Sequence, residues 1–371
     1  MRKFGFISLT LFLLFGFLPQ ATASNSVITL VNKPHQLFDG TFLNDDLATD
    51  LSPTGSLGKA VEQKRTGIRT WVIDAALLDE VADMANGYVL KNEATPTGEL
   101  IAKEWMARLL LATSGDRIIV LPYGNPDVAL AKRLAPSELR LYSAYAYERA
   151  SFHLNRRIAE ENSDLSDSGT SDLSGPLRKK YTQSRQALTS LSSIVKAPEL
   201  QALRAKLAVL LSPSLNNEEQ RIFSYNADAA VADTVNRLRI TGGKYQIASK
   251  TGKLPVTVIN DFSVPVTVNI KFMASNSRIQ VSNVTGLQIP ANSRTQLAMP
   301  FSVIAPGATT IVAQITNTDG RVIGKSSRLA INLTIFDSKV TGFTIGAAVL
   351  LFIAALTQTI RRVRKGRNEE Q

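Results

Sequence analysis

Two aspartates, Asp74 and Asp127, stand where the sequence could place acid and base chemistry. Asp74 follows an apolar run, residues 68–73, and Asp127 ends the segment Pro122-Tyr123-Gly124-Asn125-Pro126 after a second apolar run, residues 117–121. The carboxyl ends of parallel strands share one rim, so we expect Asp74, Tyr123, Asn125 and Asp127 to converge there. Two carboxylates roughly 5 to 9.5 Å apart at such a rim could hydrolyse a glycosidic bond.

The same two aspartates have a simpler explanation. Each stands directly before a predicted helix, and aspartate is a preferred N-cap because its carboxylate accepts hydrogen bonds from free backbone N–H groups. Trp71, Tyr123 and Tyr88 could stack on sugar rings, but such side chains also pack in cores. We therefore predict no catalytic residue. Asp74 and Asp127 remain candidates for catalysis, and Trp71, Tyr123 and Asn125 remain candidates for binding.

Composition excludes most other chemistry. The chain has no cysteine and two histidines, His35 and His153, which excludes a thiolate nucleophile, a cysteine zinc site and an iron-sulfur cluster. His153 lies beside the apolar stripe of a predicted helix, which favours a packed or surface role over metal ligation. Ser-Asp-Leu-Ser occurs twice within residues 163–176, but its spacing does not match a calcium loop, so a flexible loop is predicted there. No metal and no cofactor are predicted.

The elements that would position the aspartates form a mixed pattern over residues 24–162. The predicted elements follow in this order: strand 68–73, helix 75–86, helix 99–113, strand 117–121, a helix from Asp127 or Val128, and a long helix over 136–162. This order predicts a reduced α/β domain with parallel strands and extra helices. Two strong strands are too few to close an eight-stranded barrel. Residues 177–243 are predicted to be a further helical segment, with Pro198 and Pro213 as boundaries.

Residues 244–337 change to short runs that alternate apolar and polar side chains. Val264, Val266, Val268, Ile270 and Phe272 give one such run. About seven strands, separated by turn residues such as Asp319-Gly320, predict an antiparallel β-sandwich of immunoglobulin-like type. The Cys, Trp, Cys core of true immunoglobulin domains is lacking.

Both ends of the sequence indicate export and membrane anchoring. Residues 1–23 combine a basic start, an apolar stretch and Ala21-Thr22-Ala23, which is typical of a cleaved signal peptide, with an uncleaved first membrane helix as the alternative. Residues 340–360 contain no charge and are long enough for a transmembrane helix, a buried core helix being the alternative. Residues 361–371 form a basic tail. The positive-inside rule makes this tail cytoplasmic and predicts a single-pass type I protein of the cell membrane with an extracytoplasmic ectodomain.

The charge distribution argues against nucleic-acid binding. The formal net charge is +11, but a value of only about +6 remains when the charged residues flanking the two apolar end segments are set aside. The absence of cysteine from a long exported ectodomain argues against an animal cell-surface receptor, which would usually carry disulfides. We therefore interpret the chain as a bacterial envelope protein.

Four blocks of sequence resemble an uncharacterised actinobacterial family, catalogued as a domain of unknown function. They are residues 39–57, Thr70-Trp71-Val72-Ile73-Asp74-Ala75-Ala76-Leu77-Leu78-Asp79, Leu121-Pro122-Tyr123-Gly124-Asn125-Pro126-Asp127 and Leu254-Pro255-Val256-Thr257-Val258-Ile259-Asn260-Asp261. Genes of this family often lie beside the lipid II flippase of peptidoglycan synthesis, and the resemblance supplies no activity, cofactor or catalytic residue. The family usually has proline at the position of Ala75 and a second acid at the position of Asn125, and its members are commonly much longer.

Two functions follow as expectations. The first is a non-enzymatic scaffold or accessory factor in cell-wall assembly, anchored by one membrane span, with cell-wall synthesis proteins or wall glycan as partners. The alternative is a glycan-binding or glycan-cleaving ectodomain that uses the strand-end carboxylates Asp74 and Asp127.

Overall fold

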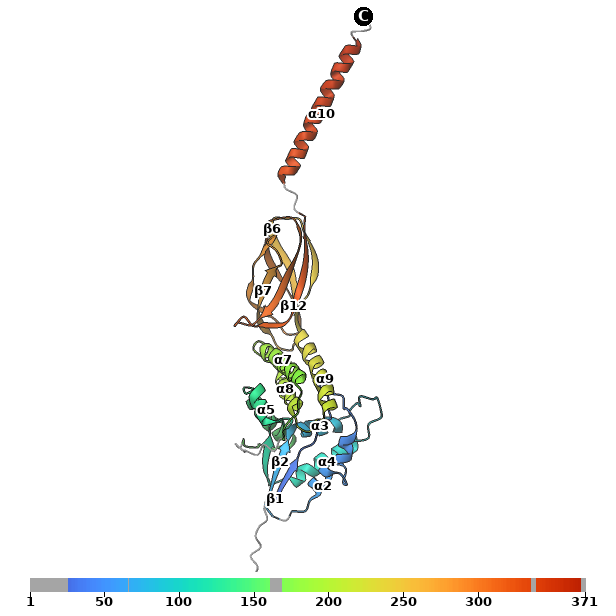
Figure 1. Ribbon diagram of the computed structural model, residues 1–371, viewed down its shortest axis with the longest axis vertical. Coiled ribbons are helices and arrows are strands. Elements are labelled where there is room, and N and C mark those ends of the chain that lie inside the picture. The colour runs from blue at the N-terminus through green and yellow to red at the C-terminus, as the bar shows by residue number, and fades with distance from the viewer. Residues whose placement is uncertain (1–25, 66, 161–168, 335–337, 368–371) are drawn as a thin grey trace, which may run out of the picture.

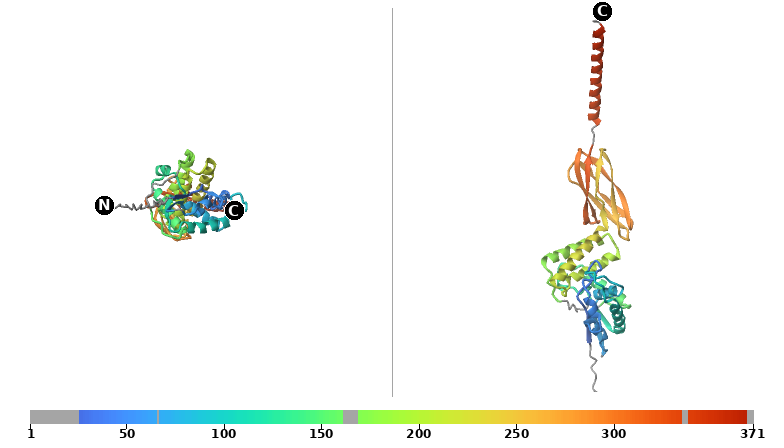
Figure 2. Two further views of the ribbon diagram at one scale, coloured as in Figure 1. Left: turned by 90° about the horizontal axis from the view of Figure 1, so that it is seen from below. Right: turned by 90° about the vertical axis from the view of Figure 1, so that its right-hand side faces the viewer.

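The computed structural model describes residues 26–65, 67–160, 169–334 and 338–367. It is elongated, with three parts in a row (Figures 1 and 2). Residues 26–236, here called the head, form one end. Residues 237–334, here called the β domain, lie in the middle, and the helix α10 (Ser338–Arg367) forms the other end. The predicted signal peptide lies outside the described residues.

A three-stranded parallel sheet organises the first half of the head. Its order is β1 (Ser26–Leu30), β2 (Arg69–Asp74) and β3 (Arg117–Leu121), with Trp71 of β2 paired to Ile28 on one side and Ile118 on the other. Trp71 and its neighbours on one face join the main core, whereas Val72, Ile119 and Leu121 form a small cluster on the opposite face. Burial on both faces explains why β2 and β3 are continuous apolar runs. Both were predicted. The edge strand β1 was not.

Helices surround this sheet: α1 (Asp46–Leu51), α2 (Ser56–Glu62), α3 (Ala75–Ala85), α4 (Glu99–Ala112), α5 (Val128–Leu134) and α6 (Leu139–His153). The predicted helix over 136–162 is shorter in the structure. It ends at His153 because Asn155 adopts a φ of +48°, a left-handed conformation in which a helix does not continue. The mixed α/β character predicted for this region is confirmed.

The second half of the head is a helical segment that joins the sheet to the β domain. It contains α7 (Gly175–Ser192), α8 (Pro198–Lys206), the 3₁₀ helix η1 (Leu207–Leu211) and α9 (Asn217–Asn236). Asn216 and Glu219 form a reciprocal capping box that fixes the start of α9. Part of the predicted flexible loop, residues 163–168, lies outside the described residues; within the described remainder, Ser171 and Leu173 are buried.

The β domain consists of two sheets. One has the order β4-β6-β10-β8 and the other the order β5-β12-β11-β7-β9. The strands are β4 (Leu238–Ile240), β5 (Gly243–Ile247), β6 (Thr251–Asn260), β7 (Val266–Ala274), β8 (Ile279–Val281), β9 (Val284–Ile289), β10 (Ser293–Val303), β11 (Gly307–Thr316) and β12 (Val322–Leu333). The two sheets share one buried core, which contains Val256 and Val258 of the first sheet and Ile311 and Leu329 of the second.

The alternating pattern correctly predicted a β domain here, and β6 to β12 correspond to the seven expected runs. The structure adds β4 and β5, which lie in or beside the segment predicted to be helical. β5 pairs in parallel with β12, Lys244 lying opposite Ala330. Among the described residues, no helix is both long enough and apolar enough to cross a membrane.

Candidate functional site

The strand ends bring Asp74 close to the segment that follows β3. Asp74 lies opposite Leu121 in the sheet, and its Oδ1 accepts hydrogen bonds of 2.9 Å from the N–H groups of both Ala76 and Gly124. The first bond caps α3, and the second fixes the turn after β3. Gly124 and Asn125 have φ angles of +74° and +42°, so this turn depends on residues that tolerate a left-handed backbone. Of the four residues expected to converge at this rim, Asp74 contacts the 123–125 turn through the Gly124 N–H, and this contact is structural.

Asp127 is also a cap. Its Oδ1 accepts from the N–H of Leu130 at 2.9 Å, and its Oδ2 accepts from the N–H of Ser171 at 3.0 Å. The first bond starts α5, and the second ties down the described end of the 163–176 loop. Asp74 is 3% exposed and Asp127 is 6% exposed. Both carboxylates therefore hold backbone N–H groups inside the head instead of facing solvent.

The aromatic candidates are buried as well. Trp71 is fully buried, and its Nε1–H donates to Asp116 Oδ2 at 2.9 Å. Arg69 donates from Nε to the same oxygen at 2.9 Å, so one acid at the start of β3 fixes two residues of β2. The Tyr88 hydroxyl donates to Asp45 and accepts from the N–H of Gly98 at 2.8 Å. Trp71 and Tyr88 thus use their polar atoms within the head.

Asp79, which the sequence did not identify as a candidate, binds more side chains than Asp74 or Asp127 does. The Tyr123 hydroxyl donates to Asp79 Oδ2 at 2.7 Å, while Arg149 Nε and His153 Nε2 lie 2.8 and 2.6 Å from Oδ1. Burial alone would raise the pKa of Asp79. The hydrogen bond from His153 and the charge of Arg149 outweigh it and hold that pKa below its ordinary value. Arg149 and His153 lie four residues apart on α6, a spacing that places both on one helix face. This four-residue spacing was the signal in the sequence from which the cluster around Asp79 could have been predicted.

Glu80 and Lys206 both bind residues 35–37 and so connect the helical segment to the sheet region. The Glu80 carboxylate accepts from the N–H groups of His35 and Gln36 at 3.1 Å, and Lys206 Nζ donates to Gln36 Oε1 at 2.9 Å and to the Leu37 carbonyl at 3.0 Å. Burial raises the pKa of Glu80 to about 8, and burial lowers the pKa of Lys206. Lys206, at the end of α8, therefore holds residues 35–37 in place across the head.

Burial likewise raises the pKa of Asp74 to about 7, although its two backbone hydrogen bonds act in the opposite direction. A raised pKa can identify a catalytic acid, but only where the group can reach a substrate. Asp74 is enclosed by the turn that it supports. No group of three or more acidic or histidine side chains able to hold a metal ion occurs among the described residues.

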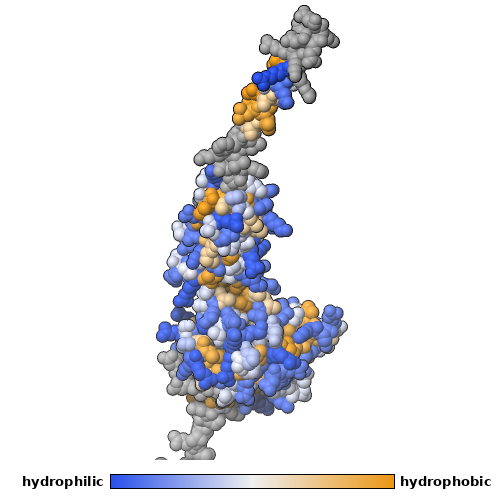
Figure 3. All heavy atoms as spheres, turned by 45° about the horizontal axis from the view of Figure 1, so that its top comes forward, coloured by the Kyte–Doolittle hydropathy of each residue, from blue (hydrophilic) through white to orange (hydrophobic). Residues whose placement is uncertain are grey.

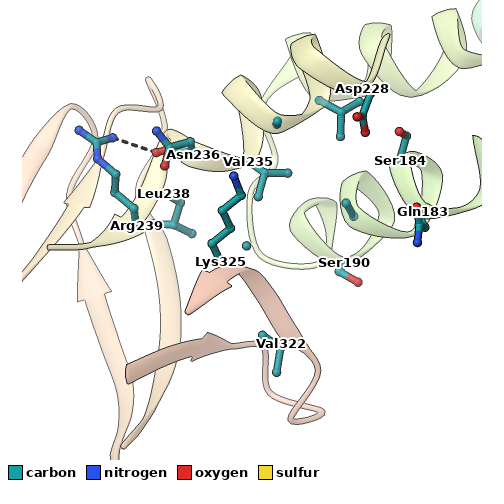
Figure 4. A pocket seen from close by; sticks show the side chains of 14 residues that line it. Gln183, Ser184, Ser190, Asp228, Val235, Asn236, Leu238, Arg239, Val322 and Lys325 are labelled. Atoms are coloured by element: carbon teal, nitrogen blue, oxygen red, sulfur yellow. Dashed lines mark hydrogen bonds between the residues drawn. The ribbon is translucent and has the colours of Figure 1, made fainter. Parts of the chain in front are cut away.

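A cavity of about 320 Å³ lies where the head meets the β domain. Figure 4 shows that its walls come from α7 and α9 on one side and from β4 and β12 on the other. Val231, Val235, Leu238 and Val322 supply apolar wall, while Asp228, Arg239 and Lys325 supply charge. Asp228 is paired with Lys180 at 2.7 Å, and Arg239 with Asp261 at 2.6 Å. The size suits a small apolar group, and the position is that of a joint between two parts.

Comparison with known families gives one match. A family model described as "Family of unknown function (DUF6049)" matches residues 126–368, well over half of the chain. Of the candidate residues, only Asp127 lies within the matched range. No curated protein matches the chain.

Solved structures resemble a quarter of the chain at low similarity. WR4, a C. elegans MSP family member, is 14% identical with a TM-score of 0.20 and covers 26% of this chain and 97% of its own. The CARDB domain of PF1109 from Pyrococcus furiosus is 13% identical with a TM-score of 0.21, and it covers 26% of this chain and 91% of its own. Native E. coli alpha-2-macroglobulin is 18% identical with a TM-score of 0.21, covering 26% of this chain and 6% of its own.

Proposed function

The chain belongs to the DUF6049 family of unknown function, and we propose that it is a non-enzymatic, membrane-anchored protein of the bacterial cell envelope. In this proposal residues 340–360 span the membrane, the β domain is a spacer, and the head is held outside the cell as a docking module. The span is inferred from the uncharged sequence of residues 340–360 and from the exposed side chains of α10, because no described helix by itself is long and apolar enough to cross a membrane. The observation that carries the proposal is the order of the three parts, with the head and the helix α10 at opposite ends (Figure 1).

The exposed side chains of α10 support the anchor. Leu350, Leu351 and Phe352 are 70%, 72% and 68% exposed, and Val349 and Ile353 beside them are also more than half exposed. Five consecutive residues point in all directions around a helix, so no single partner surface in the chain covers them. Figure 3 shows this apolar band on the helix, with polar residues following it. A hydrocarbon environment would remove all of this apolar surface from water.

The flanking sequence supports the orientation. Arg361, Arg362, Arg364, Lys365 and Arg367 follow the uncharged residues 340–360, whereas the preceding flank has only Asp337 and Lys339 close by. Basic residues collect on the cytoplasmic side of membrane spans. The sequence of residues 1–23, typical of a signal peptide, agrees with an exported head.

The carboxylates of the head support a non-enzymatic role. Asp74 and Asp127 accept hydrogen bonds from four backbone N–H groups, and Asp79 is held by Tyr123, Arg149 and His153. A carboxylate that caps a helix is not free to move protons on a bound sugar. The role in cell-wall assembly is the more specific part of the proposal. It is supported by the resemblance to the actinobacterial family with genes near the lipid II flippase. The immunoglobulin-like type of the β domain also remains a prediction.

A topology experiment tests the anchor. The full chain carries one tag after residue 371 and a second tag inserted between residues 163 and 168, and it is produced in a bacterium. Carbonate-washed membranes should retain it, and protease added to spheroplasts should remove the head tag while the tail tag stays protected. A matched chain that ends at residue 337 should be released from the membrane fraction. Recovery of the full chain as a soluble protein, or protection of the head tag, would overturn the proposal.

A crosslinking experiment tests the wall connection. Membranes carrying the full chain are crosslinked and the chain is purified through the tail tag, with membranes that carry the same full chain without the tail tag as the control for nonspecific capture. Enrichment of enzymes or transporters of peptidoglycan synthesis is the expected result. If the anchor is confirmed but no such component is enriched in repeated experiments, the role in wall assembly is wrong while the anchor stands.

A further inference from the structure

The β domain has an unusual charge for its size. Residues 237–334 contain eleven lysines and arginines but only two acids, Asp261 and Asp319, which gives a net charge of +9. The head, residues 26–236, contains 23 basic and 26 acidic residues, a net charge of −3. Apart from the basic residues of α10, the positive charge of the described chain therefore lies in the β domain and not in the head. A concentration of this kind attracts anions and destabilises the domain unless a partner or counterions compensate it.

Three of these cations share the outer face of the five-stranded sheet. Lys244 on β5 lies opposite Ala330 of β12, and Arg328 stands two residues before Ala330 on the same face. Arg328 lies opposite Val312 of β11, and Lys271 of β7 lies opposite Gln314, two residues further along β11. From strand spacing and rise, the three backbone positions are about 8 and 12 Å apart. They form a diagonal line across the sheet.

All three side chains are exposed and available. Among the residues that the structure describes, none of them lies within ion-pairing distance of an acid. Their neighbours on this face are small or neutral: Ala330, Thr310, Val312, Gln314 and Asn332. By contrast, Arg237 and Arg239 at the head end of the β domain are paired with Glu199 and Asp261.

An open hollow of about 420 Å³ lies at one end of this line. Lys244 forms part of its wall, and Thr310, Asn276 and Asn332 add hydroxyl and amide donors. Ala308 and Ala330 are small enough to leave the space open. A cation beside hydroxyl and amide donors is the chemistry that recognises an anionic group.

We propose that the outer face of the five-stranded sheet binds a linear, soluble polyanion along the line of Lys244, Arg328 and Lys271. A polymer fits better than a single anion because the cations are spread over a line of about 20 Å and only the hollow could enclose a compact group. It also fits better than a lipid surface, because the strands run along the long axis of the molecule (Figures 1 and 2), so that this face lines the side of the rod rather than its helical end. The inference concerns the surface alone and does not depend on the anchor.

The test measures binding of fluorescent polyphosphate of about 50 units to the full chain in a mild detergent, across a series of salt concentrations. The variant K244E/R328E/K271E should bind at least about tenfold more weakly. Its binding should also depend less steeply on salt, because a protein with fewer cations on this face releases fewer counterions from the polymer on binding. The matched control is K91E/K132E/R140E, which changes three exposed cations of the head and gives the same net charge. It should bind within about twofold of the unchanged protein, because charges beyond a Debye length of about 8 Å are screened.

Three results would overturn the inference. Polyphosphate that does not bind the unchanged protein excludes it directly. An equal loss in both variants shows that net charge alone, and no particular face, attracts the polymer. Binding to vesicles that contain 30% phosphatidylglycerol, with no binding to polyphosphate, shows a lipid surface instead. Circular dichroism of both variants, expected to match the unchanged protein, distinguishes lost binding from lost folding.

Discussion

The head and the β domain use charged side chains in opposite ways. In the head, acids and bases are drawn together inside the fold: Asp116 with Arg69, Glu138 with Arg204, and Asp79 with Arg149. In the β domain the cations stand on outer faces, and most have no acidic partner among the described residues. The paired charges inside the head are therefore part of its structure, whereas the exposed, unpaired cations of the β domain are available to a partner. Substitutions of the paired charges in the head should therefore change stability, whereas substitutions of the exposed cations on the β domain should change binding.

The largest expected effect is the loss of Asp116. Asp116→Ala removes the acceptor of buried Arg69 and of Trp71 Nε1, and leaving a buried charge unpaired costs about 3 to 5 kcal/mol. Both tryptophans of the chain, Trp71 and Trp105, are buried in the head, so their fluorescence in a urea titration reports head unfolding. Lys271→Ala on the β domain is the matched change and should shift head unfolding by less than about 0.5 kcal/mol. Equal stabilities of the two variants would contradict the comparison.

The next effect is the pH dependence of the head. The pKa values of Asp74 and Glu80 are raised by burial to about 7 and about 8, above their unfolded values. The stability that a raised pKa contributes is present below the unfolded value and lost as pH rises through the folded value. The head should therefore lose on the order of 2 kcal/mol between pH 5 and pH 8. Asp79, with a lowered pKa, stays ionised over this window, whereas burial lowers the pKa of His35 below 6.5, so that the stability linked to His35 rises with pH and offsets part of the loss.

Asp74→Asn sharpens the same measurement. The amide oxygen still accepts from Ala76 and Gly124 but does not titrate, so the variant should depend less on pH and be at least as stable at pH 8. If its urea midpoint falls with pH as steeply as that of the unchanged protein, Asp74 is not the source of the dependence.

A smaller effect is expected at Asp79. Asp79→Ala leaves Arg149, His153 and the Tyr123 hydroxyl without their shared acceptor, but Arg149 is partly exposed and water replaces some of the interaction. We expect a loss of about 1 to 2 kcal/mol in the fluorescence-detected urea titration. A loss as large as that of Asp116→Ala would show that the Asp79 cluster stabilises the head more than the partial exposure of Arg149 suggests.

The smallest effect on stability is expected from the β domain. Replacing Lys244, Arg328 and Lys271 one at a time with alanine should change the calorimetric melting of the β domain by less than about 0.5 kcal/mol each, because exposed, unpaired cations contribute little. A destabilisation above about 2 kcal/mol by any one of them would mean that it has a structural role.

The sequence predicted those parts of the fold that depend on local pattern. The strands β2 and β3 are apolar runs and β6 to β12 alternate, so burial of one or both faces is visible residue by residue. β1, β4 and β5 were missed because they are short and exist through distant pairing: β5 pairs with β12 more than eighty residues later in the chain. The end of α6 was missed because Asn155 in a left-handed conformation is not distinctive in sequence.

The candidate site was predictable to a similar degree. The Asp74 carboxylate does lie at the turn after β3, where it accepts from the Gly124 N–H, and capping was recognised as the simpler role of Asp74 and Asp127. The Asp79 cluster depends on how α3 packs against α6, which no local pattern specifies. The charge difference between head and β domain, by contrast, required only the correct domain boundary. A net charge over the whole chain concealed it.

Labelling of lysines tests the central comparison most directly. The native full chain is treated briefly with an amine-acetylating reagent, and the rate at each lysine is measured by mass spectrometry against the unfolded chain. Lys206 should be protected because its side chain is only partly exposed and its Nζ donates to Gln36 Oε1 and the Leu37 carbonyl, whereas the exposed Lys244, Lys253 and Lys271 should react at close to their unfolded rates. If Lys206 reacts as fast as the lysines of the β domain, or if those lysines are as protected as Lys206, then the charges of the two parts are not used in opposite ways.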